Sequence, residues 1–401
     1  MTTRAHIAIF SCPEFGHVKP LAATVRRLVE RGHRITWITG EQYGEVVRAS
    51  GADLLGYVST RPPFSKTATA SVADLGKLGL ATMAESIEVA LPLAAAALAE
   101  DVPDLVLFDI ESVVPARTLI KRWGCRGVQV SPYLASNEVY SLHAQVFQPD
   151  EAEVQAVFGL LYGFIAESGL DEDAIWDYLT PYADRNVVLL PRELQPHGET
   201  FDERYTFIGH GVDENEADAG AGLWSPPADA KSVALLSLGS EMGNAEFFRM
   251  ALDAFGNGDR HVVMTLGRGR MGLVGDERAA NVEPHEWLPH AAVLPRADVF
   301  VTHGGMGSVV EALYFGVPMV VVPHHPENLV NGQRLAELGL ARVLPEEELT
   351  AEALRAAVDA VAEDAVMRER AQWMRECVRD GGGAERAVAV VEEFLAEGVS
   401  A

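Results

Sequence analysis

The chain has 401 residues, of which 48% are hydrophobic and 22% are charged, and its formal net charge is -26. A chain of this length exceeds what one hydrophobic core usually supports, so we expect two domains. The composition is that of a globular protein. The negative charge repels polyanions, which argues against nucleic acid and anionic membranes as partners but still allows a small anionic ligand at a local site.

The cysteines and the apolar segments predict a cytoplasmic protein. Cys12, Cys125 and Cys377 are too few and too scattered for a disulfide framework or a zinc site. The apolar run at residues 6–10 is too short for a signal sequence. We expect no window that reaches the roughly 20 apolar residues of a membrane helix. The most apolar stretch, residues 90–99, predicts a buried helix.

Strands and helices alternate along the first half of the chain. Residues 6–10 predict an apolar strand, and a helix is expected from about Pro20 to Arg31, where Gly32 ends it. β-Branched residues at 34–39 predict a second strand. The remaining elements expected in this half are strands at residues 104–108, 127–130 and 186–190 and a helix at residues 114–123.

The second half repeats this alternation after an acidic segment. Residues 209–231 are rich in Gly, Ala and Pro, which is typical of a linker. Strands are then expected at residues 232–237, 261–265, 299–302 and 318–322. We therefore predict an N-terminal domain at residues 1–208, a linker at 209–231 and a C-terminal domain at 232–401, whose last helix could pack back on the first domain.

Apolar strands that alternate with helices are typical of a parallel sheet covered on both faces. The predicted fold class is α/β, with two tandem Rossmann-like, doubly wound parallel-sheet domains that face each other across a cleft. Ligands of such sheets bind beyond the carboxyl ends of the strands, and the cleft is the natural site. Residues 60–80 and 137–172 fit the sheet pattern poorly. They are either helices that cover the sheet or the walls of an apolar substrate pocket.

A Gly-rich turn at residues 302–308 predicts a phosphate site between a strand and a helix. Ser308 lies near the expected helix N-terminus, where unpaired N–H groups and the helix dipole favour an anion. His303 could donate to a phosphate oxygen. Three glycines let the backbone turn sharply or approach a ligand: Gly304, Gly305 and Gly307. A plain turn with a serine cap is the simpler interpretation of this stretch alone.

Neighbouring residues could contact the other parts of a sugar nucleotide. Trp287 precedes a proline turn, and its ring could stack on a base. Glu311 could accept hydrogen bonds from two ribose hydroxyls. Glu327 and Asn328 follow another strand and pair a carboxylate with an amide, which suits sugar hydroxyls. Ser240 follows a strand and a glycine, so it either reaches the diphosphate or the sugar or belongs to a plain turn.

Together these residues resemble a known family. Residues 287–333 resemble the nucleotide-sugar signature of GT-B fold glycosyltransferases of family 1, and the whole chain looks like the bacterial macrolide glycosyltransferases of the oleandomycin-glycosylating type. Further matching stretches follow in collinear order at residues 15–20, 103–109, 115–117, 122–124, 194–196, 205–207 and 236–240. The resemblance implies a GT-B fold and transfer of a sugar from a nucleotide-sugar to a hydroxyl group.

Two motifs depart from the family's pattern. The family usually has Gln after Trp-x-Pro, where this chain has His290, and its sugar-reading pair is usually Asp-Gln, where this chain has Glu327 and Asn328. The replacing side chains can still form hydrogen bonds, but they differ in length from the usual ones. We expect this difference to affect which nucleotide base and which sugar are bound rather than the reaction itself. The resulting assignment gives the nucleotide to Trp287, His290, His303, Gly305, Gly307, Ser308 and Glu311, and the donor sugar to Glu327, Asn328 and Ser240.

His17 and Asp109 are the expected catalytic pair, because each follows a strand and both should lie at the carboxyl edge of the first sheet. A histidine oriented by a carboxylate can take a proton from a hydroxyl near neutral pH, whereas a lone histidine is more often a surface or cap residue. In the family that the chain resembles, the matching His is the general base and the matching Asp is its partner. The resemblance implies one displacement at the anomeric carbon with inversion, in which His303 and helix N-terminal amides stabilise the leaving diphosphate. No metal or other cofactor is expected.

The expected partners are a nucleotide-sugar donor and a small hydrophobic, hydroxylated acceptor such as a macrolide or a polyphenol. UDP-glucose or a related UDP-hexose is the favoured donor, and a dTDP-deoxysugar is the second choice. An NAD-type dehydrogenase fits less well, because the turn at residues 12–16 lacks the Gly-rich fingerprint. The pairing of His17 with Asp109 argues against a non-catalytic sugar-nucleotide binding protein, because such a protein needs no general base. The sequence leaves a homodimer open.

Overall fold

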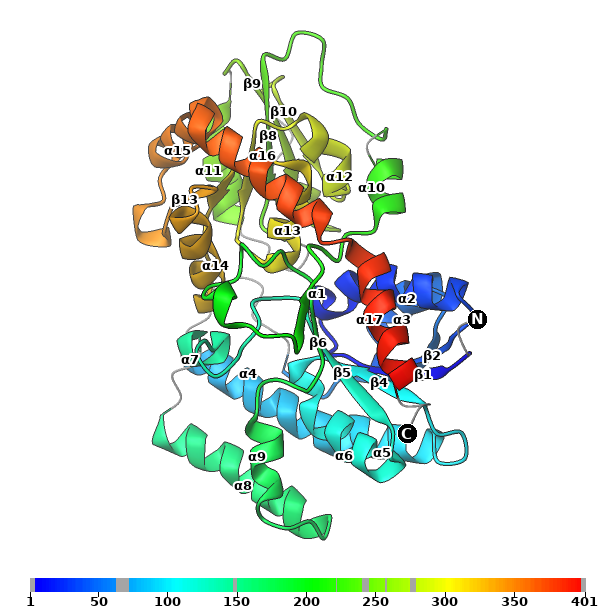
Figure 1. The fold of residues 1–401 in the computed structure, drawn as a ribbon. Helices are drawn as coiled ribbons and strands as arrows, with labels where there is room; N and C mark the ends of the chain where they lie inside the picture. Colours follow the sequence, from blue (N-terminus) through cyan, green and yellow to red (C-terminus); the bar gives the residue numbers. More distant parts are fainter. Residues whose placement is uncertain are drawn as a thin grey trace. The chain divides into compact units, whose positions relative to one another are not determined.

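The computed structural model describes residues 4–62, 72–146, 150–220, 222–239, 245–256, 258–274 and 279–397. These residues form two compact units (Figure 1). The first unit takes the described residues up to Gly211 and those from Asp380 onwards, and the second unit takes Val212–Arg379. The segment expected to be a linker therefore contains a helix of the second unit, α10 (Glu214–Gly220).

A parallel sheet in the order β3-β2-β1-β4-β5-β6-β7 forms the centre of the first unit. Its strand order reverses between β1 and β4, where Phe10 pairs with Phe108, so the chain segments that leave these two strands emerge side by side. This reversal is the topological switch point at which doubly wound sheets bind ligands. The strands are β1 (His6–Phe10), β2 (Arg34–Gly40), β3 (Asp53–Tyr57), β4 (Leu105–Phe108), β5 (Arg126–Ser131), β6 (Asn186–Val188) and β7 (Tyr205–Phe207).

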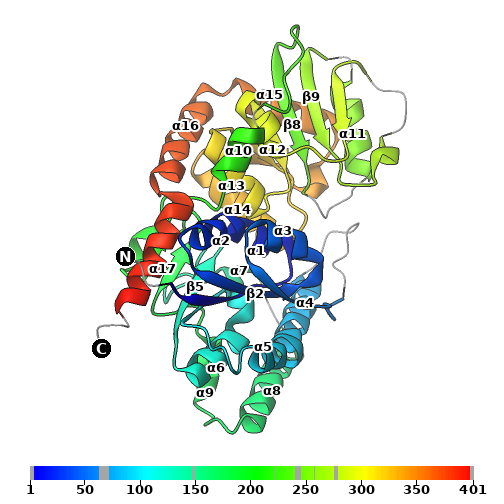
Figure 2. The ribbon, with the colours of Figure 1, turned by 90° about the vertical axis from the view of Figure 1, so that its right-hand side faces the viewer.

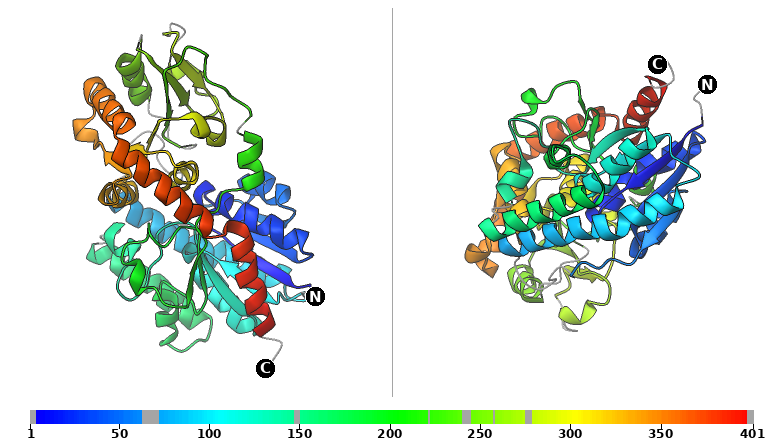
Figure 3. Two further views of the ribbon diagram at one scale, coloured as in Figure 1. Left: turned by 45° about the horizontal axis from the view of Figure 1, so that its top comes forward. Right: turned by 90° about the horizontal axis from the view of Figure 1, so that it is seen from below.

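Helices cover both faces of this sheet. They are α1 (Phe15–Val18), α2 (Ala22–Glu30), α3 (Gly44–Ala49), α4 (Val72–Glu85), α5 (Leu91–Ala97), α6 (Val113–Trp123), α7 (Leu142–Val146), α8 (Glu151–Glu167), α9 (Ala174–Leu179) and α17 (Gly383–Glu397). Helix α8 lies alongside α4 in the views of Figure 3. The described parts of residues 60–80 and 137–172 are thus largely helical.

Helices α4 and α5 are joined by a π-helical turn, Ser86–Ala90. Pro92 at the start of α5 has no N–H to donate to the carbonyl of Glu88, and its ring would crowd that carbonyl in a regular α-helix. A wider turn relieves both problems. Such π-turns frequently occur at functional sites, and this one directly follows Glu85.

The C-terminal helix α17 packs against α2 in the first unit, as Figures 1 and 2 show. Val388, Val391 and Phe394 of α17 join the core that contains Val25 and Leu28 of α2. Just before α17, Gly381 lies so close to the backbone of Ile208 that a Cβ atom would come within 2.4 Å of its carbonyl carbon. Only glycine allows this approach.

The second unit has its own parallel sheet, in the order β10-β9-β8-β11-β12-β13. This order reverses between β8 and β11, where Ser237 pairs with Thr302. The strands are β8 (Ser232–Ser237), β9 (Arg260–Thr265), β10 (Val282–His285), β11 (Val299–Thr302), β12 (Met319–Val321) and β13 (Ala341–Val343). The helices are α10, α11 (Ala245–Phe255), α12 (His290–Val293), α13 (Met306–Phe315), α14 (Pro326–Glu337), α15 (Ala351–Glu363) and α16 (Ala365–Asp380).

Two parallel-sheet α/β units confirm the predicted fold class. We expected no segment with the length and apolar composition of a membrane helix. This expectation is wrong, because Asp74–Ala97 is helical and, by length and composition, apolar enough to span a bilayer. Core helices can pass the same test. In this run Ala90, Leu91 and Ala94 pack into the core beneath the sheet, and Glu85 is buried among protein partners.

Packing of α17 predicts the effect of shortening Phe394, whose ring also lies 3.6 Å from the Arg126 guanidinium carbon. We expect Phe394→Ala to lower the free energy of unfolding by about 3 kcal/mol, because it leaves a cavity in the core of the first unit. Val366→Ala, at an exposed position of α16, should change it by less than about 0.5 kcal/mol. Urea denaturation of both variants measures this difference, and equal unfolding midpoints would contradict the packing role.

Candidate active site

The buried Asp109 carboxylate organises the polar site of the first unit. Asp109 directly follows β4 and caps the 3-10 turn Ile110–Ser112, because its Oδ1 accepts the backbone N–H of Ser112 at 3.0 Å. Its Oδ2 accepts the backbone N–H of Cys12 at 2.7 Å and lies 2.9 Å from Nδ1 of His17. A buried charge requires such partners. Three donors from two chain segments therefore hold this carboxylate in place.

His17 lies on the short helix α1, which follows β1. The first helix was expected to begin at about Pro20, but a short helix, α1, precedes it and contains His17. Its Nδ1 donates to Asp109, which leaves Nε2 as the atom that can take a proton. Its side chain is 12% exposed, and its ring meets the Tyr133 ring edge-on at a centroid distance of 5.4 Å. The imidazole is thus fixed on one side and accessible on the other.

The carboxylates around His17 strengthen its hold on a proton. Burial acts to lower the pKa of His17, but the hydrogen bond and charge of Asp109, together with Glu14 and Glu111, outweigh it and raise that pKa to about 9. Glu111 also lies 3.4 Å from Nε2 of His143, so a second carboxylate–histidine pair stands near the first.

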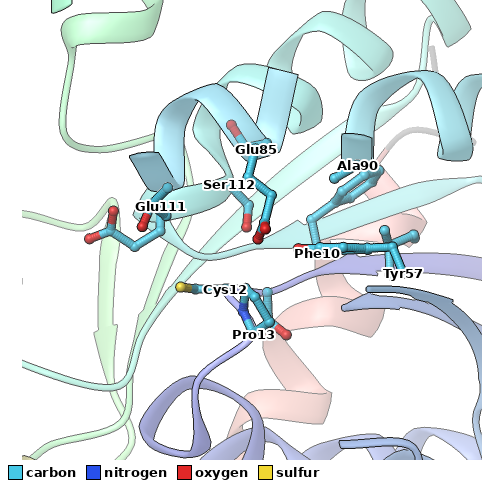
Figure 4. A pocket seen from close by; sticks show the side chains of 12 residues that line it. Phe10, Cys12, Pro13, Tyr57, Glu85, Ala90, Glu111 and Ser112 are labelled. Atoms are coloured by element: carbon cyan, nitrogen blue, oxygen red, sulfur yellow. The ribbon is translucent and has the colours of Figure 1, made fainter. Parts of the chain in front are cut away.

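A small cavity lies beside the turn that connects β1 to α1. Figure 4 shows Glu85, Glu111 and Ser112 on one side of it and Cys12 and Pro13 on the other. Its volume of about 10 Å³ has room for roughly one water molecule. This cavity is therefore too small for an organic substrate.

In the second unit, the Gly-rich turn follows β11 as predicted, but helix α13 already begins at Met306, within the stretch 302–308 that was expected to form the turn. Gly305 is its N-cap, Gly307 is exposed, and Ser308 is the third residue of the helix. Gly304 has a φ of 89°, and a Cβ there would lie 2.8 Å from the Val321 side chain. The turn therefore needs glycine, and it presents the N-terminus of a ten-residue helix.

His303 lies within this turn at the second switch point. A Cβ at Gly239, just after β8, would come within 2.8 Å of the His303 ring, and one at Gly305 within 2.4 Å. The ring thus fits against two glycines. Burial, together with the neighbouring His325 and His324, lowers the pKa of His303 to about 3. The imidazole is therefore neutral in the free protein.

Trp287, His290 and Glu311 lie in the same unit. Nδ1 of His290 lies 2.7 Å from the Glu311 carboxylate, so these two expected nucleotide contacts are coupled. Trp287 is 47% exposed, and the guanidinium of Arg268 lies 5.4 Å from its ring centroid. The loop at 267–270 therefore reaches the predicted base platform.

The pair expected to contact the donor sugar, Glu327 and Asn328, lies at the start of α14. Glu327 is half-buried, and Asn328 is 1% exposed. Among the residues that the structure describes, Oδ1 of Asn328 and Nε2 of His324 are buried without a hydrogen-bond partner. Buried polar atoms of this kind are rare in proteins and frequently mark ligand sites. Ser240 lies outside the described residues.

Sequence reasoning missed four residues that shape these sites: Arg61, Glu85, Tyr133 and Asn331. Asn331 donates to the carbonyl of Gly304 at 2.9 Å and so fixes the Gly-rich turn. Its position three residues after Asn328, on the same face of α14, is a signal that could have found it. Glu85 likewise follows Thr82 by three residues within an apolar helix. Nothing in the sequence points to Arg61.

Comparisons with known proteins match nearly the whole chain. Residues 249–389 match the family described as Erythromycin biosynthesis protein CIII-like, C-terminal domain. Oleandomycin glycosyltransferase of Streptomyces antibioticus is 37% identical, over 98% of this chain and 92% of that protein. NDP-glycosyltransferase YjiC of Bacillus licheniformis is 33% identical, over 98% of each chain.

Among solved structures, CalG4, the calicheamicin glycosyltransferase, is 33% identical and superposes with a TM-score of 0.86, over 98% of this chain and 99% of that one. Sequence and fold thus agree over nearly the full length of both kinds of relative. The chain therefore belongs to the GT-B fold glycosyltransferases of the macrolide and antibiotic type, enzymes that transfer a sugar from a nucleotide-sugar donor.

Proposed function

We propose that this enzyme transfers a hexose, with inversion and without a metal, from a UDP-glucose-like donor to a hydroxyl group of a small hydrophobic natural product such as a macrolide or a polyphenol. The observation that carries this proposal is the hydrogen bond between His17 and the buried Asp109, which directs Nε2 of His17 away from the carboxylate. The three free cysteines support a reducing compartment such as the cytoplasm.

His17 is the general base. Its Nε2 takes the proton of the acceptor hydroxyl, the hydroxyl oxygen forms a bond to the anomeric carbon, and the bond from that carbon to the diphosphate oxygen breaks with its electron pair. Asp109 stabilises the imidazolium that results. Because the pKa of His17 is raised to about 9, the imidazole of the free enzyme already carries a proton on Nε2 at neutral pH and must lose it before it can act as the base. The neutral base becomes more abundant as the pH rises, so transfer should accelerate from pH 7 towards 9.

The second unit binds the donor. The N-terminus of α13, with Gly305, Gly307 and Ser308, suits the diphosphate. His303 is neutral and can donate one N–H to a phosphate oxygen, and the diphosphate charge would in turn favour its protonation. Trp287 provides a stacking surface for the base, next to the coupled pair of His290 and Glu311.

Glu327 and Asn328 contact the donor sugar in this proposal. The buried, unpartnered Oδ1 of Asn328 fits a ligand that brings its own hydroxyl donors. A dTDP-deoxysugar is the second candidate donor, because Glu327 and Asn328 replace the usual Asp-Gln pair and alter its reach. One relative is named as an NDP-glycosyltransferase, a description that leaves the base open.

The base role of His17 is tested by His17→Ala. We expect turnover with alcohol or phenol acceptors to fall by about 100-fold to 10,000-fold, because the group that takes the proton is lost. Binding of the nucleotide diphosphate, which depends on the second unit, should be retained in calorimetry. His197→Asn, at an exposed histidine of the first unit, should keep wild-type turnover. Turnover of His17→Ala equal to wild type would remove His17 from the mechanism.

Sugar recognition by Glu327 is tested with two donors. A site built to bond a hydroxyl rejects a donor that lacks it, because its polar group is left unpaired. Glu327→Ala should therefore reduce kcat/KM for UDP-glucose more than kcat/KM for a UDP-deoxyglucose. Glu337→Ala, at an exposed position of the same helix, should affect neither donor. Equal proportional losses in Glu327→Ala would show that Glu327 does not read that hydroxyl.

A further inference from the structure

Three potential metal ligands, one of them the proposed base, lie close together, but the guanidinium of Arg61 already contacts two of them. One ligand atom each of Cys12, Glu14 and His17 lies within 4.8 Å of the others. Nη1 of Arg61 donates to Glu14 at 2.9 Å and lies 3.4 Å from Sγ of Cys12. A metal ion would have to displace this guanidinium. Arg61 therefore supplies the positive charge at this turn.

Arg61 contacts three consecutive residues of the turn between β1 and α1. Besides Cys12 and Glu14, it reaches Pro13, whose carbonyl accepts Nη2 at 3.1 Å. The carbonyl of Glu14 in turn accepts the backbone N–H of His17 at 3.0 Å. The helical turn that carries the imidazole thus begins at a residue that Arg61 holds. Only 8% of the Arg61 side chain is exposed.

Arg61 is itself anchored to the helix that covers this face of the sheet. Its Nη1 donates to Oγ1 of Thr82 on α4 at 3.0 Å, and its Nε lies 3.6 Å from Oε1 of Glu85. The other oxygen of Glu85 accepts the backbone N–H groups of Thr60 and Arg61 and, at 2.7 Å, the hydroxyl of Ser59. Figure 4 shows the Glu85 side chain directed from its helix towards Cys12 and Pro13. A buried carboxylate with this many partners is a rigid support.

We propose that Arg61 is a positioning residue for the transfer reaction: it clamps the turn at residues 12–14 against α4 and thereby fixes the place of His17. This inference rests on the proposed role of His17 as the base. Arg61 reaches the turn rather than the imidazole, so it acts through His17. The planar guanidinium bonds several acceptors at once, which an ammonium group cannot do.

A double-mutant cycle tests the proposal on the full-length enzyme. Arg61→Gln should lower kcat by about tenfold to a hundredfold, since a base displaced by about 1 Å loses rate on this scale, and the affinity for UDP should stay unchanged. Arg61→Lys should recover only part of that loss. In the His17→Ala background, Arg61→Gln should have no further effect on the residual rate, because its target is gone. Arg34→Gln, which breaks the exposed ion pair with Asp101, serves as the control and should leave kcat unchanged.

The outcomes separate this proposal from the proposed function. Losses that multiply in the double variant, or a folded Arg61→Gln enzyme with wild-type kcat, would overturn the positioning role. A rise in KM for the acceptor at constant kcat would overturn it too, because it would make Arg61 a substrate contact. Wild-type turnover in His17→Ala alone would instead refute His17 as the base. If Arg61→Gln fails to fold, Thr82→Val can replace it, because this substitution removes one hydrogen bond of Arg61. Thr82→Val should lower kcat by less than Arg61→Gln, and this loss should vanish in the His17→Ala background. A loss of kcat that persists in the double variant would contradict the proposal.

Discussion

The burial of one charge, the Asp109 carboxylate, constrains the rest of the first site. A carboxylate that is 1% exposed is tolerated only when donors surround it. These donors come from the segments that follow the two central strands: Cys12 after β1, Ser112 after β4, and His17 on α1. The strand reversal between β1 and β4 brings these segments together. The same contacts that satisfy Asp109 therefore place the imidazole.

Each unit holds a histidine at the switch point of its parallel sheet, but the surroundings shift the pKa values of the two histidines in opposite directions. Carboxylates around His17 raise its pKa to about 9, whereas burial and neighbouring histidines lower the pKa of His303 to about 3. A raised pKa makes the neutral imidazole of His17 a stronger base, which suits the removal of a proton from a hydroxyl. A neutral imidazole beside a helix N-terminus suits an incoming diphosphate, whose charge it can meet with an N–H. The fold is shared, and the electrostatic surroundings decide the role.

Sequence periodicity and motif spacing predicted much of this arrangement. The strands at 232–237 and 299–302 follow from local patterns, and so do the positions of His17, Asp109 and His303 just after strand ends. The start of α13 was placed too late, because Gly305 as N-cap allows the helix to include Met306 and Gly307. Arg61 could not be predicted, because its contact with the turn at Cys12 depends on how β3, α4 and β1 pack in three dimensions. The length of the apolar helix Asp74–Ala97 was also missed, since the buried helix was expected at residues 90–99, whereas the chain is helical from α4 through a π-turn into α5.

The central claim is that Asp109 controls the proton on His17. The ¹⁵N chemical shifts of the His17 ring, followed by NMR from pH 5 to 10 in wild type and in Asp109→Asn, test it directly. We expect Nε2 of the wild-type enzyme to titrate near pH 9 while Nδ1 stays protonated, and we expect the transition to move to lower pH in Asp109→Asn, because the charge that favours the imidazolium is lost. A wild-type His17 that titrates at or below its ordinary pKa of about 6.5, or that titrates identically in both proteins, would contradict the account.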